Sequence, residues 1–140
     1  MTDYEKNIIE KIIKDFKSNL KIDNTEWPDQ VMYLVNYINK NIVDKNIYSD
    51  IQKIININSS NFSAEFRFYV RMTPKKYVST TRLELAKKLL SHRALSQLPV
   101  SSIALIIGFS GNGDFSHAFK KKTSLAPNLW REKNIKSTII

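Results

Sequence analysis

The chain has 140 residues, carries a formal net charge of +9 at pH 7 and contains no cysteine. This length suits one domain or two small subdomains and argues against a large enzyme, and the lack of cysteine excludes disulfides, thiolate zinc sites, iron–sulfur clusters and cysteine nucleophiles. With 42% hydrophobic and 25% charged residues but only 3 glycines and 4 prolines, the composition predicts a folded, all-α protein.

The first predicted element is an amphipathic helix over residues 3–20. Its apolar side chains recur at spacings of three and four from Tyr4 to Leu20. We expect it to cap the core of the first repeat unit described below, with a dimer interface or a partner-binding face as alternatives. Residues 21–27 are predicted to be a connector. Because this region contains neither a secretory signal nor a membrane span, we expect a cytoplasmic protein.

A diverged internal repeat follows along the chain. Residues 51–57 align with residues 103–109, which places Asn56 opposite Gly108 at the end of an apolar stretch. Both residue types tolerate a left-handed φ. We therefore expect each stretch to be a short helix that ends in a tight turn at this position.

The two copies stay in register after the turn. Each has two phenylalanines four apart on one helix face, then a proline eight residues later and an aromatic residue three positions after the proline. These residues are Phe62, Phe66, Pro74 and Tyr77 in the first copy and Phe115, Phe119, Pro127 and Trp130 in the second. A supporting helix, a turn and a second helix are the helix-turn-helix plan, whose second helix lies in the DNA major groove. Duplicated helical hairpins of solenoids and scaffolds are the alternative.

These landmarks divide the chain into five segments. Two helix-turn-helix subdomains are joined by one long linker helix of about 27 Å at about 1.5 Å per residue. The segments are 1–27 (N-terminal helix and connector), 28–73 (first subdomain), 74–91 (linker helix), 92–133 (second subdomain) and 134–140 (C-terminal tail).

Charge is distributed unevenly along the chain. Residues 1–27 have a net charge of −1, whereas residues 28–140 have a net charge of +10. Such a surplus favours an anionic partner, and double-stranded DNA suits the helix-turn-helix plan. The alternative is a basic protein whose charges are simply solvated.

The second copy carries a recognisable signature. The motifs Ile-Ala-Leu-Ile-Ile-Gly-Phe-Ser at 103–110 and Phe-Ser-His-Ala-Phe-Lys-Lys-Lys-Thr at 115–123, with Ala126, Pro127 and Trp130, resemble the AraC/XylS transcription regulators. The resemblance extends upstream through 72–77 and 82–90 and covers about residues 28–133. It implies a seven-helix DNA-binding domain whose two recognition helices enter successive major grooves, about 34 Å apart. It also implies RNA polymerase as a partner.

Position in the family and the N-terminal placement of groove-reading residues predict the base contacts. In the second unit the recognition helix is expected from about Asn112 to Lys122, and in the first from about Ser59 to Val70. The candidates are Asn112, Gly113, Ser116 and His117 in the second unit and Ser60, Ser63 and Ala64 in the first. Asparagine can bond adenine bidentately, whereas the short side chains of the first unit predict little discrimination.

Basic side chains near the recognition helices are predicted to contact phosphates. Positive charge contributes more to affinity than to specificity. The candidates are Lys120, Lys121 and Lys122 in the second unit and Arg67, Arg71, Lys75 and Lys76 in the first. The alternative for each of these side chains is that it lies at a solvated helix end and contacts no phosphate.

The first unit departs most from the family pattern. Gln52 replaces a small residue, Glu65 an apolar one and Arg71 a turn glycine, so we expect a weaker grip from this unit. In the second unit Gly113 and Asp114 are unusual. An acidic Asp114 near phosphates requires a helix N-terminus to stabilise it.

An enzyme is the first rival interpretation. DNA-repair methyltransferases whose regulatory half resembles this family need a reactive cysteine, which this chain lacks. It also has no phosphate-binding glycine loop and no serine–histidine arrangement, and its two histidines, His92 and His117, have no cysteine partners for a metal. We therefore predict no catalytic residue, no metal site and no cofactor.

Two alternatives concern the kind of regulator. An adaptor protein could keep the fold and lose specific DNA recognition, or the chain could be the DNA-binding fragment of a longer effector-responsive regulator. Met1 and the natural-looking start favour a short stand-alone regulator that resembles the MarA and SoxS subgroup. We expect a monomer rather than a dimer.

Overall fold

The computed structural model describes residues 1–20, 26–58 and 60–135, and these form α-helices, a short 3₁₀ helix and no strand. The predicted all-α fold is therefore confirmed. None of the described helices is long and apolar enough to cross a membrane. Most of the predicted connector and tail lies outside the described residues. The elements are α1 (Asp3–Asn19), α2 (Asp29–Lys40), α3 (Ile47–Ile57), α4 (Phe62–Val70), α5 (Pro74–Leu90), the 3₁₀ helix η1 (Arg93–Leu95), α6 (Val100–Ile106), α7 (Asn112–Thr123) and α8 (Pro127–Asn134).

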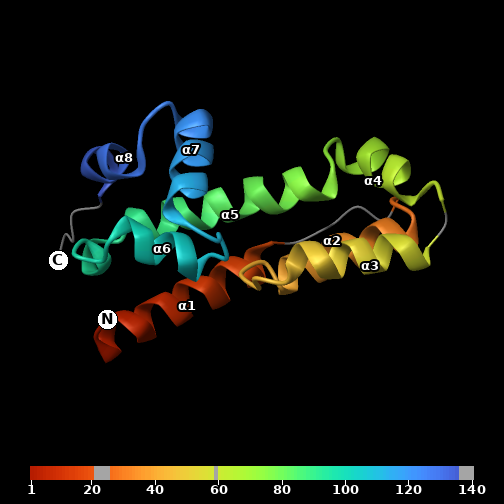
Figure 1. Cartoon of the computed structure of the whole chain (residues 1–140). Coiled ribbons are helices and arrows are strands. Elements are labelled where there is room, and N and C mark those ends of the chain that lie inside the picture. The colour runs from red at the N-terminus through yellow and green to blue at the C-terminus, as the bar shows by residue number, and fades with distance from the viewer. Residues whose placement is uncertain (21–25, 59, 136–140) are drawn as a thin grey trace.

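Helix α5 is the axis of the molecule. Pro74 is its first residue, and the Thr73 side chain caps it by accepting a hydrogen bond from the Lys76 amide at 3.1 Å. One end of α5 carries α2, α3 and α4, here called the first subdomain, and the other carries α6, α7 and α8, the second subdomain (Figure 1). The predicted pair of subdomains on one linker helix is thus confirmed.

Each subdomain has its own hydrophobic core. Phe62 and Phe66 are fully buried in the first core, together with α2, α3 and Val78 of the linker helix. Phe115 and Phe119 are fully buried in the second core, together with α6 and the C-terminal half of α5. The paired phenylalanines identified from the repeat therefore anchor both recognition helices to the fold.

The repeat is also visible where α4 and α7 end. Arg71 and Ser124, which occupy the same position in the two copies, both cap their helix in the left-handed region with a φ of 71°. A non-glycine residue in this conformation costs roughly 1–2 kcal/mol. Helix α4 thus ends in the left-handed turn expected there, although Arg71 stands where a glycine is usual.

The turn between the two helices of each unit differs between the copies. In the second unit Gly108 has a φ of 101°, and the amides of Gly108 and Phe109 donate to the carbonyls of Leu105 and Ala104, which closes α6 as a Schellman motif. The matching prediction for Asn56 is wrong. Asn56 stays inside α3, where its Oδ1 accepts from Gln52 Nε2 at 3.0 Å.

Instead, Asn58 ends α3. Its Nδ2 donates to the carbonyl of Ile54 at 2.7 Å, and its φ of −103° is not left-handed. Helix α3 is therefore longer than α6, because a side-chain hydrogen bond replaces the glycine turn as the end of the helix.

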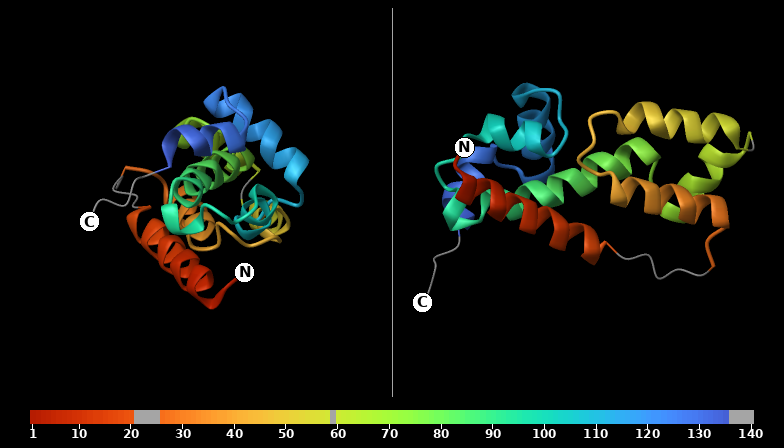
Figure 2. Two further views of the ribbon diagram at one scale, coloured as in Figure 1. Left: turned by 90° about the vertical axis from the view of Figure 1, so that its left-hand side faces the viewer. Right: turned by 90° about the horizontal axis from the view of Figure 1, so that it is seen from below.

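Helix α1 does not cap the first core, so that prediction is wrong. Its buried residues Ile9 and Phe16 belong to the core of the second subdomain, and α1 contacts α5 and η1. Figure 2 shows α1 beneath the half of α5 that carries the second subdomain. The helix was correctly predicted from its periodicity, but that pattern does not say which core it covers.

Arg82 joins the linker helix to both subdomains. Its guanidinium, 2% exposed, donates to the carbonyls of Ile42 at 2.7 Å and Asp44 at 2.8 Å in the loop between α2 and α3. It also lies 5.5 Å from the ring centroid of Tyr48 and against Gly108, where an added Cβ would come within 2.5 Å of Nη2. Burial lowers the pKa of this guanidinium.

Replacing Phe16 with alanine tests the position of α1. We expect Phe16→Ala to lower the free energy of unfolding by about 3 kcal/mol, because it leaves a cavity in the core. Amide hydrogen exchange should speed up more in α6–α8 than in α2–α4. Tyr4→Ala on the same helix, where the side chain is 68% exposed, is the matched control and should change little. Equal effects in both subdomains would contradict this packing.

Replacing Gly108 with alanine tests the contact with Arg82. We expect Gly108→Ala to destabilise the protein by about 3 kcal/mol, from backbone strain together with the clash against a hydrogen-bonded guanidinium. Gly113→Ala is the control, since a Cβ there meets nothing within 4 Å and should stabilise α7 by up to about 1 kcal/mol. Urea unfolding of the two variants measures both. Similar stability of the two would refute the constraint.

Candidate nucleic-acid interface

The exposed face of α7 is set by its two buried phenylalanines. At about 100° per residue, a position two after each buried residue points to the opposite side of the helix. His117 and Lys121 occupy these positions and are exposed, as is Gly113, four residues before His117. Three of the predicted contact residues thus lie along one exposed stripe of α7.

Asn112 and Ser116 lie beside this stripe. Asn112 is exposed as the first residue of α7, whereas Ser116 is only half exposed. The Ser116 hydroxyl donates to Asn112 Oδ1 at 3.4 Å. This contact directs the Asn112 carbonyl oxygen toward its own helix, and within the described parts of the chain no hydrogen bond is recorded for its NH2 group.

Asp114 lies in the first turn of α7 and is exposed. The positive end of the helix dipole stabilises a carboxylate in the first turn. Asp114 thus lies at a helix N-terminus, as we expected for an acidic residue near phosphates.

The recognition helix of the first unit is shorter than predicted. Helix α4 begins at Phe62, so Ser60 lies in the preceding turn, and Ser59 lies outside the described residues. Ser63, Ala64 and Arg67 are exposed on α4 as expected. The structure therefore places the three on the solvent side of α4, with Ser60 at its entrance.

Phe68 also lies on the exposed side of α4, and sequence reasoning missed it. Its side chain is 64% exposed although it is large and apolar. The spacing of four from Ala64 was the available signal, because residues four apart share a helix face.

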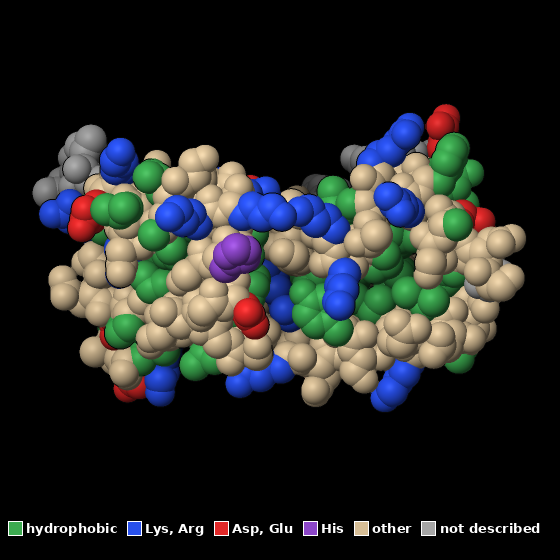
Figure 3. Space-filling view, turned by 45° about the horizontal axis from the view of Figure 1, so that its top comes forward, with side chains coloured by type: hydrophobic (Ala, Val, Ile, Leu, Met, Phe, Trp, Pro, Cys, Tyr) green, Lys and Arg blue, Asp and Glu red, His purple; other side chains and the backbone are tan. Residues whose placement is uncertain are grey.

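Basic side chains connect the two recognition helices. Figure 3 shows Lys and Arg side chains along the middle of the face that carries α4 and α7, below a hollow in the outline between the two subdomains. Arg71, Lys75 and Lys76 are exposed between α4 and the start of α5, and Lys120 and Lys121 are exposed on α7. The two recognition helices thus share one positively charged, hollowed face.

Lys122 differs from its two neighbours. Its Nζ lies 3.5 Å from Glu84 Oε1 on the linker helix, and the same oxygen lies 3.2 Å from Lys87 Nζ. Lys122 is therefore directed toward α5, whereas the structure records no ion pair for Lys120 or Lys121 among the described residues.

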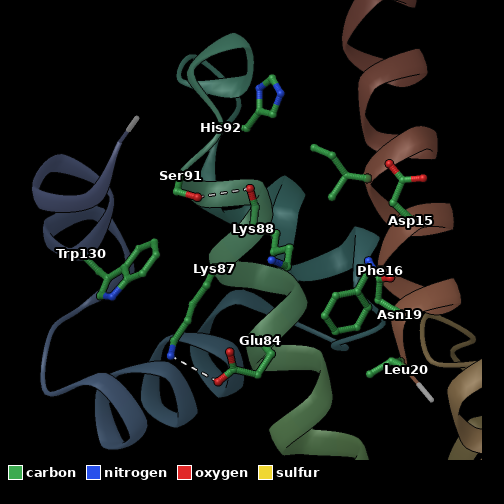
Figure 4. Close-up of a pocket in the computed structure, with 11 residues that line it drawn as sticks. Asp15, Phe16, Asn19, Leu20, Glu84, Lys87, Lys88, Ser91, His92 and Trp130 are labelled. Carbon is green, nitrogen blue, oxygen red and sulfur yellow. Dashed lines mark hydrogen bonds and ion pairs between the residues drawn. The ribbon is translucent and has the colours of Figure 1, made fainter. Parts of the chain in front are cut away.

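A pocket of about 620 Å³ lies between α1, α5 and α8. Phe16 and Trp130 flank it from opposite sides, and the ion pair of Glu84 and Lys87 lies on its α5 wall (Figure 4). None of the candidate DNA contacts lines it. No cluster of three His, Asp or Glu side chains suited to a metal occurs in the described part of the chain.

Comparisons with known proteins point to DNA-binding regulators. A family model described as a helix-turn-helix domain matches residues 51–133. The chain is 30% identical over 126 residues to the probable transcriptional regulator LumQ of Photobacterium leiognathi, covering 89% of this chain and 49% of LumQ. It is 30% identical over 115 residues to the raffinose operon transcriptional regulatory protein RafR of Pediococcus pentosaceus, covering 82% of this chain and 39% of RafR.

A solved structure has the same fold. The C-terminal domain of AraT, a response regulator from Geobacillus stearothermophilus, superposes with a TM-score of 0.70 at 24% identity and covers 83% of this chain and 94% of that domain. The chain spans about half of LumQ and less of RafR. The similarity thus covers nearly all of this one domain but only half or less of the two regulators.

Proposed function

Because the chain belongs to the AraC-type helix-turn-helix family, we propose that it is a transcription regulator that binds double-stranded DNA with both subdomains. The observation that carries this proposal is the shared basic face of α4 and α7, on which each helix is anchored by two buried phenylalanines. Two recognition helices on one rigid linker helix suit insertion into successive major grooves.

The second subdomain is the principal sequence reader in this proposal. Asn112 at the start of α7 and His117 in its middle supply hydrogen-bonding groups, and Gly113 between them lets the backbone approach the bases closely. Ser116 contributes from the edge of the same surface. In the first subdomain Ser60, Ser63 and Ala64 face the DNA with short side chains.

Affinity comes mainly from the basic side chains around the two helices. Lys120 and Lys121 are the phosphate contacts of the second subdomain, and Lys122 contributes to the field while it pairs with Glu84. The corresponding contacts of the first subdomain are Arg67, Arg71, Lys75 and Lys76. Such contacts set the position of the protein on the duplex and not its sequence preference.

RNA polymerase is the proposed protein partner, through which the regulator would activate transcription in the cytoplasm. Membership of the family supports this partner. The chain acts as a monomer in this scheme, because one chain already presents two recognition helices. No catalytic residue, metal or cofactor takes part.

The architecture predicts a bipartite binding site. DNA fragments selected by the purified protein should share two elements one helical turn apart, about 10–10.5 base pairs centre to centre. The element contacted by Asn112 and His117 should be the more sharply defined. Insertion of about half a turn between the elements should abolish simultaneous binding, because α5 fixes the spacing.

Two results would contradict this docking. A single short element would show that only one subdomain reads DNA. Failure to shift any genomic DNA at low salt would favour the adaptor alternative. A gel-shift assay with the selected fragment and its spacer variants measures both outcomes.

The salt dependence of binding distinguishes Lys121 from Lys122 on α7. We expect Lys121→Met to reduce the slope of log affinity against log salt by about 1, because one phosphate contact is lost. Lys122→Met should reduce it less, because Glu84 competes for this side chain. Lys11→Met on the exposed side of α1 changes the net charge equally and is the control. Equal slopes for all three variants, or no loss of binding between about 50 and 200 mM salt, would overturn the assignment.

A further inference from the structure

We propose that Phe68, together with Ala64, makes the first subdomain select thymine through apolar contact with thymine methyl groups in the major groove. This inference rests on the proposed DNA binding and adds the class of base that α4 reads. It replaces the expectation of a subdomain with little discrimination.

Both side chains lie opposite the buried face of α4. Ala64 and Phe68 each follow a fully buried phenylalanine, Phe62 or Phe66, by two positions, and they are four residues apart. They therefore share the face directed away from the core. In the second subdomain the same two positions hold His117 and Lys121, which are both polar.

The Phe68 ring is held in place although it is exposed. The Tyr69 ring meets it edge to face with centroids 4.9 Å apart, and the Arg71 guanidinium carbon lies 5.9 Å from its centroid. An aromatic ring in contact with two neighbouring side chains loses less conformational entropy when it binds than a free one. The ring is thus a preformed apolar surface on the recognition helix.

Polar alternatives for base reading are few on this face. Ser63 is short, and the longer Glu65 lies to one side, where its Oε1 accepts from Gln30 Nε2 at 2.7 Å. Arg67 is exposed next to Phe68 in sequence and is one of the proposed phosphate contacts. The exposed centre of α4 therefore offers methyl and ring carbons, and thymine is the base that presents a methyl group in the major groove.

Replacement of thymine by deoxyuridine removes the methyl group and leaves base pairing unchanged. Each thymine in one element of the selected site is replaced in turn, and affinity is measured for wild type, Phe68→Ala and Leu129→Ala. Leu129 is 51% exposed on α8 and serves as the matched control for loss of an exposed apolar side chain. Thermal unfolding of both variants checks that the fold is retained.

For the wild type we expect a loss of about four-fold per contacted thymine in the element bound by α4. This is the ratio that corresponds to the roughly 0.8 kcal/mol of burying one methyl group. Phe68→Ala should bind the thymine site more weakly and should distinguish it from the deoxyuridine site less than the wild type does, because only Ala64 then remains to contact the methyl groups. Leu129→Ala should keep the wild-type distinction.

Three results would overturn the inference. The first is equal affinity of the wild type for the thymine and the deoxyuridine sites. The second is an unchanged preference for thymine in Phe68→Ala. The third is loss of this preference in Leu129→Ala to the same extent as in Phe68→Ala. Specific binding without any thymine preference would reject this reading of α4 and leave the proposed function intact. Absence of specific DNA binding would reject both.

Discussion

The buried guanidinium of Arg82 is the contact on which the spatial relation of the two subdomains depends. It extends from the linker helix, binds two carbonyls of the α2–α3 loop and fills the space beside Gly108 in the turn before α7. A buried charge is costly unless it is hydrogen-bonded. Arg82 therefore ties the linker helix to the α2–α3 loop of the first subdomain by hydrogen bonds and packs against the Gly108 turn of the second.

This constraint explains why the two copies of the repeat have diverged unequally. The turn between α6 and α7 must pass close to Arg82, and only a residue without a Cβ fits there at a φ of 101°. In the first subdomain Asn58 closes α3 with its side chain instead. Divergence in the first subdomain is thus a change in how a helix ends, and both phenylalanines of its core are retained.

Two further contacts of the linker helix are made by α1, which the repeat does not contain, and by the end of α7. Helix α1 places Phe16 against the second core, and Glu84 on another face of α5 pairs with both Lys87 and Lys122. The second recognition helix is therefore braced from the core side and from the linker. The first recognition helix carries instead an exposed aromatic ring on its outer face, so the two subdomains present different chemistry to DNA.

Local pattern was sufficient to predict much of this protein. Periodicity and the repeat determined the helical fold, the two units, the linker and the exposed positions on α4 and α7, because these depend on residues three or four apart. Tertiary structure alone decided which core α1 covers, where Lys122 points, that Asn56 stays helical and what Arg82 binds. The Arg82 contacts join residues 40 and 38 positions apart, and no helical period encodes contacts at such a distance.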